Sequence, residues 1–519
     1  MNKYNQSLLA VIAVCASALA HAAEDELWQD LGDHAGAQRP AVGSAPLPLK
    51  YRLVSLNTSA LQARFQLAPS FASQALRDSS GLISLPLPDG GLRTFRIVES
   101  SVMQPALAAK FPEFKTYQGE AVDDPNVTVR LDWTAAGFHA MIFSGDDVIY
   151  IDPYQLGDTQ RYLNYYKRDA QALPRLPDKV IETPKLRPQS GLQVQPVEPA
   201  ARSAGALLRT YRIAIAATGE YTKYQGGTVA KGLSSIVTAL NRVNGIYEKE
   251  LSVHFDLVAD NDKIIYTNAA TDPYTNNDSH KLLTQNQANL NKVIGSTKYD
   301  IGHVFSTGGG GLAGSGVVCD KAYKAEGETG SPAPFGDAFW VDYVAHEIGH
   351  QFGGDHTFNS PRGNCAGNSA PQSRYEIGSG STIMAYAGIC DTDDLQPNSD
   401  PYFHSRSFDQ IRAYVETGTG KTCGVATATA NTAPVVDIGA SGMTLPKQTP
   451  FMLTGTGYDA DGDTLTYSWE EYDLGKLMSL AGTKTKNNPG GNLGTVPLFR
   501  ALPPQSSADR YFQIGRAHV

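Results

Sequence analysis

Three things are scarce in this sequence, and each scarcity narrows what the protein can be. Beyond residue 22 no stretch of 18 residues is both apolar and uncharged, so no later segment is expected to span a membrane. Lysine and arginine form no long block and the net charge is -9, which argues against nucleic acid or an anionic membrane as the main partner. Histidine occurs only 11 times in 519 residues, so a cluster of histidines is informative.

The rest of the composition is that of a globular protein. With 41% apolar and 18% charged residues, a mostly disordered chain is excluded. At roughly 150 residues per domain, the length predicts about three domains. The N-terminus is typical of an export signal, with Lys3, a short apolar run over 7–20 and a small-x-small site at Ala20-His21-Ala22. We therefore expect a soluble, secreted, monomeric protein.

Cysteine is also scarce, and its positions are confined. Removal of the signal takes away Cys15 and leaves four cysteines, at positions 319, 365, 390 and 423. An even number in an exported protein predicts two disulfides, with three possible pairings. Because all four lie within one stretch of the chain, both disulfides are expected in one domain.

Hydrophobic periodicity divides the chain into regions. Residues 23–172 show the alternation typical of strands and contain no cysteine after the signal, and 173–205 is rich in proline and lacks periodicity, as in a linker. From Tyr211 to residue 306 the pattern is strand, helix, strand, helix, strand, with the second helix at 280–294. This order predicts a sheet covered by helices, with parallel neighbours joined by right-handed crossovers.

Two segments carry a choice of interpretations. The glycine run at 307–319 lacks the lysine of a phosphate loop, and is either a flexible turn or an exposed edge strand beside a cleft, where a peptide backbone could approach. After a linker at 426–433, the all-β stretch 434–519 contains Asp459, Asp461 and Asp463. These carboxylates could bind Ca²⁺, although a solvated turn is favoured because the glycine spacing does not fit a helix-loop-helix site.

The end of the chain has a separate feature. Residues 514–519 read IGRAHV, which resembles a translated sequencing adapter. We therefore expect the protein to continue beyond Gln513 and the last module to be truncated.

Three of the histidines fall in the eleven residues HEIGHQFGGDH, 346–356. On a helix, His346 and His350 lie one turn apart and project side by side, so both could bind one Zn²⁺. On a continued helix His356 would lie about 15 Å farther along the axis, out of reach. Gly353 can take a positive φ and end the helix, which lets His356 fold back as the third ligand. Glu347 lies beside the first ligand, where it can act on a bound water.

These five positions, His346, Glu347, His350, Gly353 and His356, match the zinc-protease signature of the metzincins. The chain is similar to the bacterial reprolysin-like (M12-type) branch over about 205–425. Met384, 28 residues after the third histidine, resembles the methionine of the turn that metzincins place beneath the zinc.

The resemblance implies a fold and a domain order. The catalytic domain is expected to be a metzincin α+β or α/β domain, a twisted mixed sheet with helices and zinc in the cleft. The expected parts are a signal peptide (1–22), a β-rich propeptide (23–172), a linker (173–205), the catalytic domain (206–425), a second linker (426–433) and a partial β-sandwich module (434–519).

The resemblance also implies two disulfide pairs, and some details of the sequence depart from the family pattern. The implied pairs are Cys319–Cys423 and Cys365–Cys390. Thr357 follows the third histidine, where reprolysins usually have aspartate. Tyr386, two residues after the methionine, resembles the astacin and serralysin turns, in which the tyrosine hydrogen-bonds the developing oxyanion; simple packing against the turn is the alternative. The propeptide has no cysteine, so it cannot inhibit the enzyme by placing a thiolate on zinc. Inhibition by a carboxylate or by blockage of the cleft is left.

The implied function is hydrolysis of extracellular proteins or peptides by a secreted zinc endopeptidase made as a zymogen. Zinc activates a water, Glu347 is the general base, and the substrate lies extended along the segment Gly311–Gly316. Two alternatives are a catalytically silent zinc-binding adhesion protein and another zinc hydrolase with a distant glutamate as third ligand. Intact Glu347 argues against the first, and the position of His356 against the second.

Overall fold

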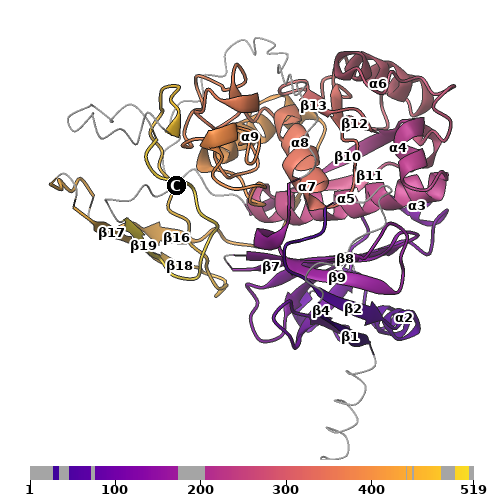
Figure 1. The fold of residues 1–519 in the computed structure, drawn as a ribbon, viewed down its shortest axis with the longest axis horizontal. Coiled ribbons are helices and arrows are strands. Elements are labelled where there is room, and N and C mark those ends of the chain that lie inside the picture. Colours follow the sequence, from indigo (N-terminus) through magenta and orange to yellow (C-terminus); the bar gives the residue numbers. More distant parts are fainter. Residues whose placement is uncertain are drawn as a thin grey trace, which may run out of the picture. The chain divides into compact units, whose positions relative to one another are not determined.

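The structure is a computed structural model that describes residues 27–33, 46–71, 76–145, 147–172, 205–439, 441–446, 449–480 and 497–512. The predicted signal peptide, the predicted linker up to residue 204 and the IGRAHV segment lie outside these ranges. The chain divides into two compact units, and Figure 1 shows their elements. The first unit consists of Met1–Pro40, Pro48–Ser100 and Lys115–Asp169, and the second contains the remainder.

The first unit is built on one antiparallel sheet of nine strands, in the order β1-β2-β9-β8-β7-β6-β5-β4-β3. The strands are β1 (Trp28–Asp33), β2 (Arg52–Leu56), β3 (Leu82–Pro86), β4 (Leu92–Glu99), β5 (Lys115–Ala121), β6 (Thr128–Thr134), β7 (Gly137–Ser144), β8 (Asp147–Pro153) and β9 (Arg161–Tyr166). Helix α2 (Thr58–Gln66) begins at Asn57, whose side chain accepts a hydrogen bond from the amide of Ala60. The prediction of a β-rich N-terminal region is confirmed.

The core of this unit follows from the alternation of its strands. Side chains such as Val129, Leu131 and Ile142 share one face of the sheet, where they are buried together with Leu61 and Phe65 of α2. Burial of these apolar side chains is the main term that stabilises the unit.

The second unit contains a mixed sheet, as predicted, and this sheet has six strands. Its order is β11-β10-β12-β14-β13, with β15 paired to β10 beyond this path. The strands are β10 (Leu207–Ala217), β11 (Val253–Leu257), β12 (Ile301–Ser306), β13 (Gly310–Ala313), β14 (Gly327–Gly330) and β15 (Val425–Ala428). The pairs β10/β11, β10/β12 and β12/β14 are parallel, whereas β13/β14 and β10/β15 are antiparallel. The glycine-rich strand β13 therefore ends the sheet.

Helices pack on both faces of this sheet (Figure 1). The helices of this unit are α3 (Pro105–Ala108), α4 (Gly219–Tyr224), α5 (Val229–Leu251), α6 (Ser279–Val293), α7 (Asp337–Phe339), α8 (His346–Gln351) and α9 (Ser405–Glu416). Val304 of β12 packs in one cluster with Leu290 of α6. The neighbouring His303 points to the other face and contacts Gln351 of α8. The sheet thus holds α8 on the face opposite α6.

The segment expected as one helix around HEIGH is composite. Between α7 and α8 the turn Trp340–Ala345 is π-helical. A π turn has i→i+5 hydrogen bonds and changes only the local register, so a 3.6-residue apolar pattern does not reveal it. Trp340 is buried there, with the guanidinium of Arg242 over its ring, and Arg242 also pairs with Asp337 at 2.5 Å. Helix α8 starts from this anchored turn.

Part of the region expected as propeptide belongs to the second unit. Met103 pairs in parallel with Leu257 of β11, and the amide of Gln104 donates to the carbonyl of Leu257 at 2.9 Å. Lys110, just after α3, pairs with Asp262 at 2.6 Å. The segment 101–114 therefore extends the edge of the mixed sheet, and the predicted domain boundaries stay predictions.

The C-terminal residues contain short strands. They are β16 (Val435–Asp437) paired with β18 (Thr456–Tyr458), and β17 (Phe451–Thr454) paired with β19 (Asp509–Phe512). Both pairs are antiparallel, and the β-sandwich module stays a prediction. Among the described helices, none has the length and hydropathy needed to cross a bilayer.

Candidate active site

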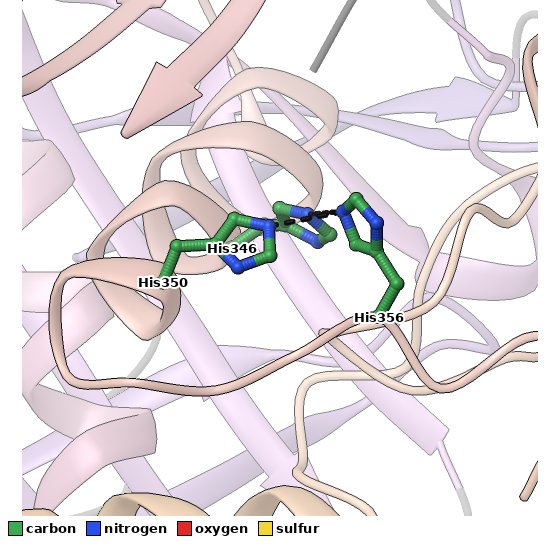
Figure 2. Close-up of side chains that lie close together, drawn as sticks. All are labelled: His346, His350 and His356. Atoms are coloured by element: carbon green, nitrogen blue, oxygen red, sulfur yellow. Dashed lines mark hydrogen bonds between the residues drawn. The ribbon is translucent and has the colours of Figure 1, made fainter. Parts of the chain in front are cut away.

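The first two histidines of the cluster lie on α8, one turn apart. His346 and His350 are 2% exposed each, and their ring centroids are 4.7 Å apart. Figure 2 shows both rings reaching toward His356, which comes from the loop after the helix. The structure therefore brings together the three histidines that the sequence analysis singled out.

The turn between α8 and His356 is the one that the glycines predict. Gly353 has φ +86°, and its amide donates to the carbonyl of His350 at 2.8 Å. The amide of Gly354 donates to the carbonyl of Gly349 at 2.9 Å. This pair of hydrogen bonds is a Schellman motif, which ends a helix with a residue in the left-handed region. The chain then reverses and carries His356 back to the helix.

Backbone carbonyls determine which ring nitrogen of each histidine carries a proton. The Nδ1 atoms of His346, His350 and His356 each lie 2.6 Å from a carbonyl oxygen, those of Ile383, Gly354 and Asn368 respectively. A carbonyl can only accept, so each Nδ1 carries the proton and each Nε2 is left with a lone pair.

The three lone pairs converge on one point. The Nε2 atom of His356 lies 3.2 Å from that of His346 and 3.0 Å from that of His350. Lone pairs at such separations repel unless a cation lies between them. Three imidazoles whose Nδ1 atoms face backbone carbonyls and whose Nε2 atoms meet are the donor set that catalytic zinc sites use, so these residues fit Zn²⁺.

Glu347 is a residue of α8, and its side chain lies against β13, the strand at the end of the sheet. Its side chain is fully buried. A Cβ atom added to Gly311 of β13 would lie 2.2 Å from Oε1 of Glu347, so the carboxylate fills the space that a side chain at Gly311 would take. The predicted base therefore lies against the strand that was predicted to meet the substrate.

Helix α8 is held on the sheet by its last residue. Gln351 Nε2 donates to the carbonyl of Gly302, and Gln351 Oε1 lies 3.0 Å from Nδ1 of His303. Burial lowers the pKa of His303 to about 4, although the hydrogen bond to Gln351 opposes the shift. His303 is therefore neutral at physiological pH, and it positions the helix through hydrogen bonds alone.

Met384 packs beneath the helix. It is fully buried, and a Cβ added to Gly349 would lie 2.5 Å from its Sδ, so the sulfur sits against the helix backbone. The amide of Thr357 donates to the carbonyl of Met384 at 3.1 Å, which joins this turn to the residue after His356.

Tyr386 is packed against the histidines. Its ring centroid lies 4.5 Å from that of His356, 5.6 Å from that of His346 and 4.6 Å from that of Phe358. Ring packing is thus one role of this tyrosine. A role of its hydroxyl in the reaction stays a prediction.

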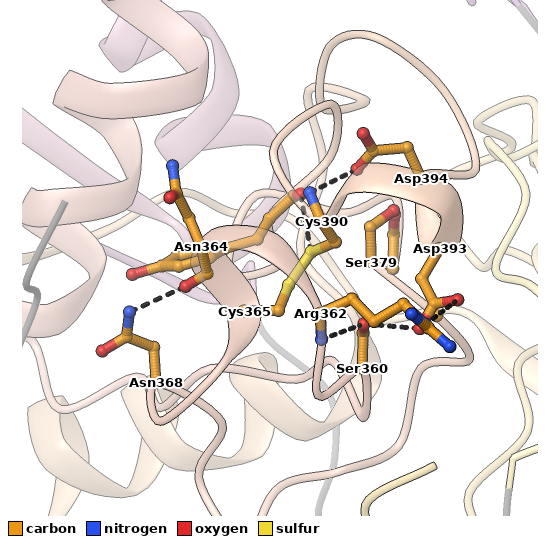
Figure 3. The surroundings of a disulfide bond; sticks show 12 residues. Ser360, Arg362, Asn364, Cys365, Asn368, Ser379, Cys390, Asp393 and Asp394 are labelled. Carbon is orange, nitrogen blue, oxygen red and sulfur yellow. Dashed lines mark hydrogen bonds and ion pairs between the residues drawn. A yellow bond between two sulfur atoms is a disulfide. The ribbon is translucent and has the colours of Figure 1, made fainter. Parts of the chain in front are cut away.

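Both disulfides implied by the resemblance are formed, Cys319–Cys423 and Cys365–Cys390. Figure 3 shows the second, which joins the loop after His356 to the segment after Met384. The amide of Asn368 donates to the carbonyl of Cys365 at 3.2 Å, and the carbonyl of Asn368 orients His356. The disulfide therefore stabilises the loop that fixes the third histidine.

A small pocket opens beside His346. Asp342 and Tyr386 line it together with Asn398 and with Ala172, from the residues just before the predicted linker.

The predicted acidic turn is also present in the C-terminal region. Ligand atoms of Asp459, Asp461 and Asp463 lie within 4.8 Å of one another. Oδ1 of Asp459 accepts from the amides of Asp461 and Asp463, as in an ordinary turn. Calcium binding there stays a prediction.

Comparison with known proteins identifies the domain that carries the site. Residues 208–413 match the profile of the reprolysin-like metallopeptidases of family M12B. No curated protein sequence matches the chain. The crystal structure of metalloproteinase-II from Bacteroides fragilis is similar at 12% identity, with a TM-score of 0.37 over 69% of this chain and 95% of that one, a likeness too low to support further conclusions. The family match supports a reprolysin-like metallopeptidase domain over residues 208–413, the part of the chain that carries the three histidines.

Proposed function

We propose that this chain is a secreted endopeptidase that holds Zn²⁺ with His346, His350 and His356 and uses Glu347 as its general base. The observation that supports this most is the convergence of three Nε2 lone pairs next to a buried carboxylate. A zinc ion held by these histidines would supply Lewis-acid chemistry, which activates water and the scissile carbonyl. Glu347 takes the proton of the attacking water and passes it to the leaving amine.

Strand β13 provides the place for an extended substrate. It ends the sheet order, so among the described strands one of its edges has no neighbour. A peptide can add to such an edge through main-chain hydrogen bonds. Gly311 of this strand lies against the side chain of Glu347. We propose that the hydroxyl of Tyr386, two residues after Met384, donates a hydrogen bond to the oxyanion. The substrates are therefore proteins or peptides.

We also propose that the chain is made as a zymogen and is inhibited by blockage of the cleft. Asn398 Nδ2 donates to the carbonyl of Ala170 at 3.3 Å, and Ala172 lines the pocket beside His346. These residues precede the predicted linker at 173–205. Cutting this linker is expected to release the block.

Metal exchange tests the zinc site. Wild-type protein, cut in the linker, should cleave an unfolded protein substrate, lose this activity to a chelator and regain it with Zn²⁺. His356→Ala should hold little zinc, whereas His280→Ala, which changes an exposed histidine of α6, should hold as much as wild type. Zinc bound at full occupancy in His356→Ala would contradict the proposed ligand set.

A further inference from the structure

A buried carboxylate lies in the loop between the third histidine and Met384. Glu376 is 1% exposed. Its oxygens accept four hydrogen bonds, from the hydroxyls of Thr357 and Thr382 and from the amides of Ser381 and Thr382. A carboxylate is costly to bury unless its oxygens are satisfied, and here neutral donors from two separate segments do so.

One set of these contacts reaches the residue after His356. The hydroxyl of Thr357 donates to Oε2 of Glu376 at 2.5 Å, and the amide of Glu376 donates to the carbonyl of Thr357 at 2.8 Å. Both the side chain and the backbone of Glu376 therefore hold the loop segment that carries His356.

The other set reaches the turn that orients His346. Oε1 of Glu376 accepts from the amide of Ser381 at 2.9 Å, and Oε2 from the hydroxyl of Thr382 at 2.6 Å. The next residue, Ile383, supplies the carbonyl oxygen that fixes Nδ1 of His346. Gly380 has φ +65°, and an added Cβ would lie 3.0 Å from Cδ of Glu376. The turn is therefore shaped around the carboxylate.

We propose that Glu376 is a positioning residue of the metal site, which sets His346 and His356 relative to each other by tying together the two segments that hold them. The inference rests on the proposed zinc site. His350 is oriented by the carbonyl of Gly354 within the Schellman turn, and no contact of Glu376 described above reaches that turn. Loss of the carboxylate should thus disturb two ligands and spare the third.

Metal binding tests this role without relying on catalysis. Glu376→Gln keeps the shape but replaces one acceptor oxygen with a donor group that faces other donors. Residues that orient metal ligands are worth about 10–100-fold in metal affinity, and we expect a loss in this range for Zn²⁺ in chelator competition. The visible spectrum of the Co²⁺-substituted variant should change. In ¹⁵N-histidine NMR, the Nδ1–H signals of His346 and His356 should shift while that of His350 stays.

A rescue and a control separate positioning from general stability. Adding Thr357→Asp to Glu376→Gln supplies a carboxylate from the loop segment of His356, and it should restore most of the Zn²⁺ affinity and the Co²⁺ spectrum. Asp300→Asn removes another buried carboxylate. Asp300 lies just before β12 and pairs with Arg212 of β10. This variant should unfold more easily and yet bind Zn²⁺ as tightly as wild type.

The outcomes are decisive in either direction. If Glu376→Gln does not fold, Thr357→Val removes one donor with little change of shape and should still weaken Zn²⁺ binding several-fold. Wild-type affinity and an unchanged Co²⁺ spectrum in Glu376→Gln or Thr357→Val would overturn the role of Glu376. A wild type that binds metal but cleaves nothing would contradict the proposed function only, and one that binds no metal would overturn both.

Discussion

Gly311→Ala should disable the proposed base without removing the metal. The new Cβ would lie 2.2 Å from Oε1 of Glu347 and 2.6 Å from its Cδ, whereas ordinary contact begins near 3.4 Å. The carboxylate must therefore move by roughly 1 Å, because the strand is paired to β14 and cannot easily retreat. A misplacement of about 1 Å can cost about 100-fold in rate, or about 2.7 kcal/mol of transition-state stabilisation.

The assay is kcat/KM on a peptide substrate, normalised to the zinc content of each sample. Gly232→Ala is the matched control, since its Cβ would lie 2.8 Å from Ile265 and 3.3 Å from Thr222, a crowded position near the start of α5. It should lower stability by about 1–3 kcal/mol and leave the zinc-normalised rate within a few-fold of wild type. Wild-type kcat/KM in Gly311→Ala would refute the placement of Glu347 against β13.

Three further predictions concern Tyr386, the two disulfides and His254. Tyr386→Phe should keep zinc and KM but lose about 100-fold or more in kcat if the hydroxyl stabilises the oxyanion, and an unchanged kcat in steady-state assays would leave ring packing as its only role. Replacing both Cys365 and Cys390 by serine should weaken zinc binding in chelator competition, because the carbonyl of Asn368 loses its support. The same change at Cys319 and Cys423 should lower only the free energy of unfolding, by about 2–4 kcal/mol. Equal zinc affinity in the two double variants would contradict this. Burial alone lowers the pKa of His254, but hydrogen bonds to Asp256 and Glu248 raise it to about 9. Because this pKa is above the unfolded value near 6.5, the protonated ring stabilises the fold by an amount on the order of 3 kcal/mol, which is complete below pH 6.5 and is lost as pH rises through 9. The free energy of unfolding in urea should therefore differ less between pH 6 and pH 9.5 in His254→Gln than in wild type.

The predictable part of the fold is the part that local patterns encode. The periodicity from Tyr211 to residue 306 predicted the order of β10, α5, β11, α6 and β12, because side-chain periods follow directly from strand and helix geometry. The π turn at 340–345 leaves no such pattern. The pairing of Met103 with Leu257 could not be predicted either, because contacts between segments about 150 residues apart depend on the whole fold.

The same contrast holds within the site. The turn at Gly353 follows from the requirement that His356 reach the helix, so the sequence alone was enough. The groups that orient the three rings are the carbonyls of Ile383, Gly354 and Asn368, and backbone atoms have no signature in a sequence. Glu376 was missed for a related reason: it lies 19 residues after Thr357, and only the folded loop brings its carboxylate to two threonines. The threonine in place of the usual aspartate after the third histidine was the one available signal.

The most direct test of the account compares wild type with Glu347→Ala, both cut in the linker at 173–205, in cleavage of an unfolded protein and in zinc content. We expect equal zinc in the two samples and cleavage in the wild type only, because Glu347 takes the proton and the histidines hold the metal. Cleavage by Glu347→Ala at the wild-type rate would contradict the central claim.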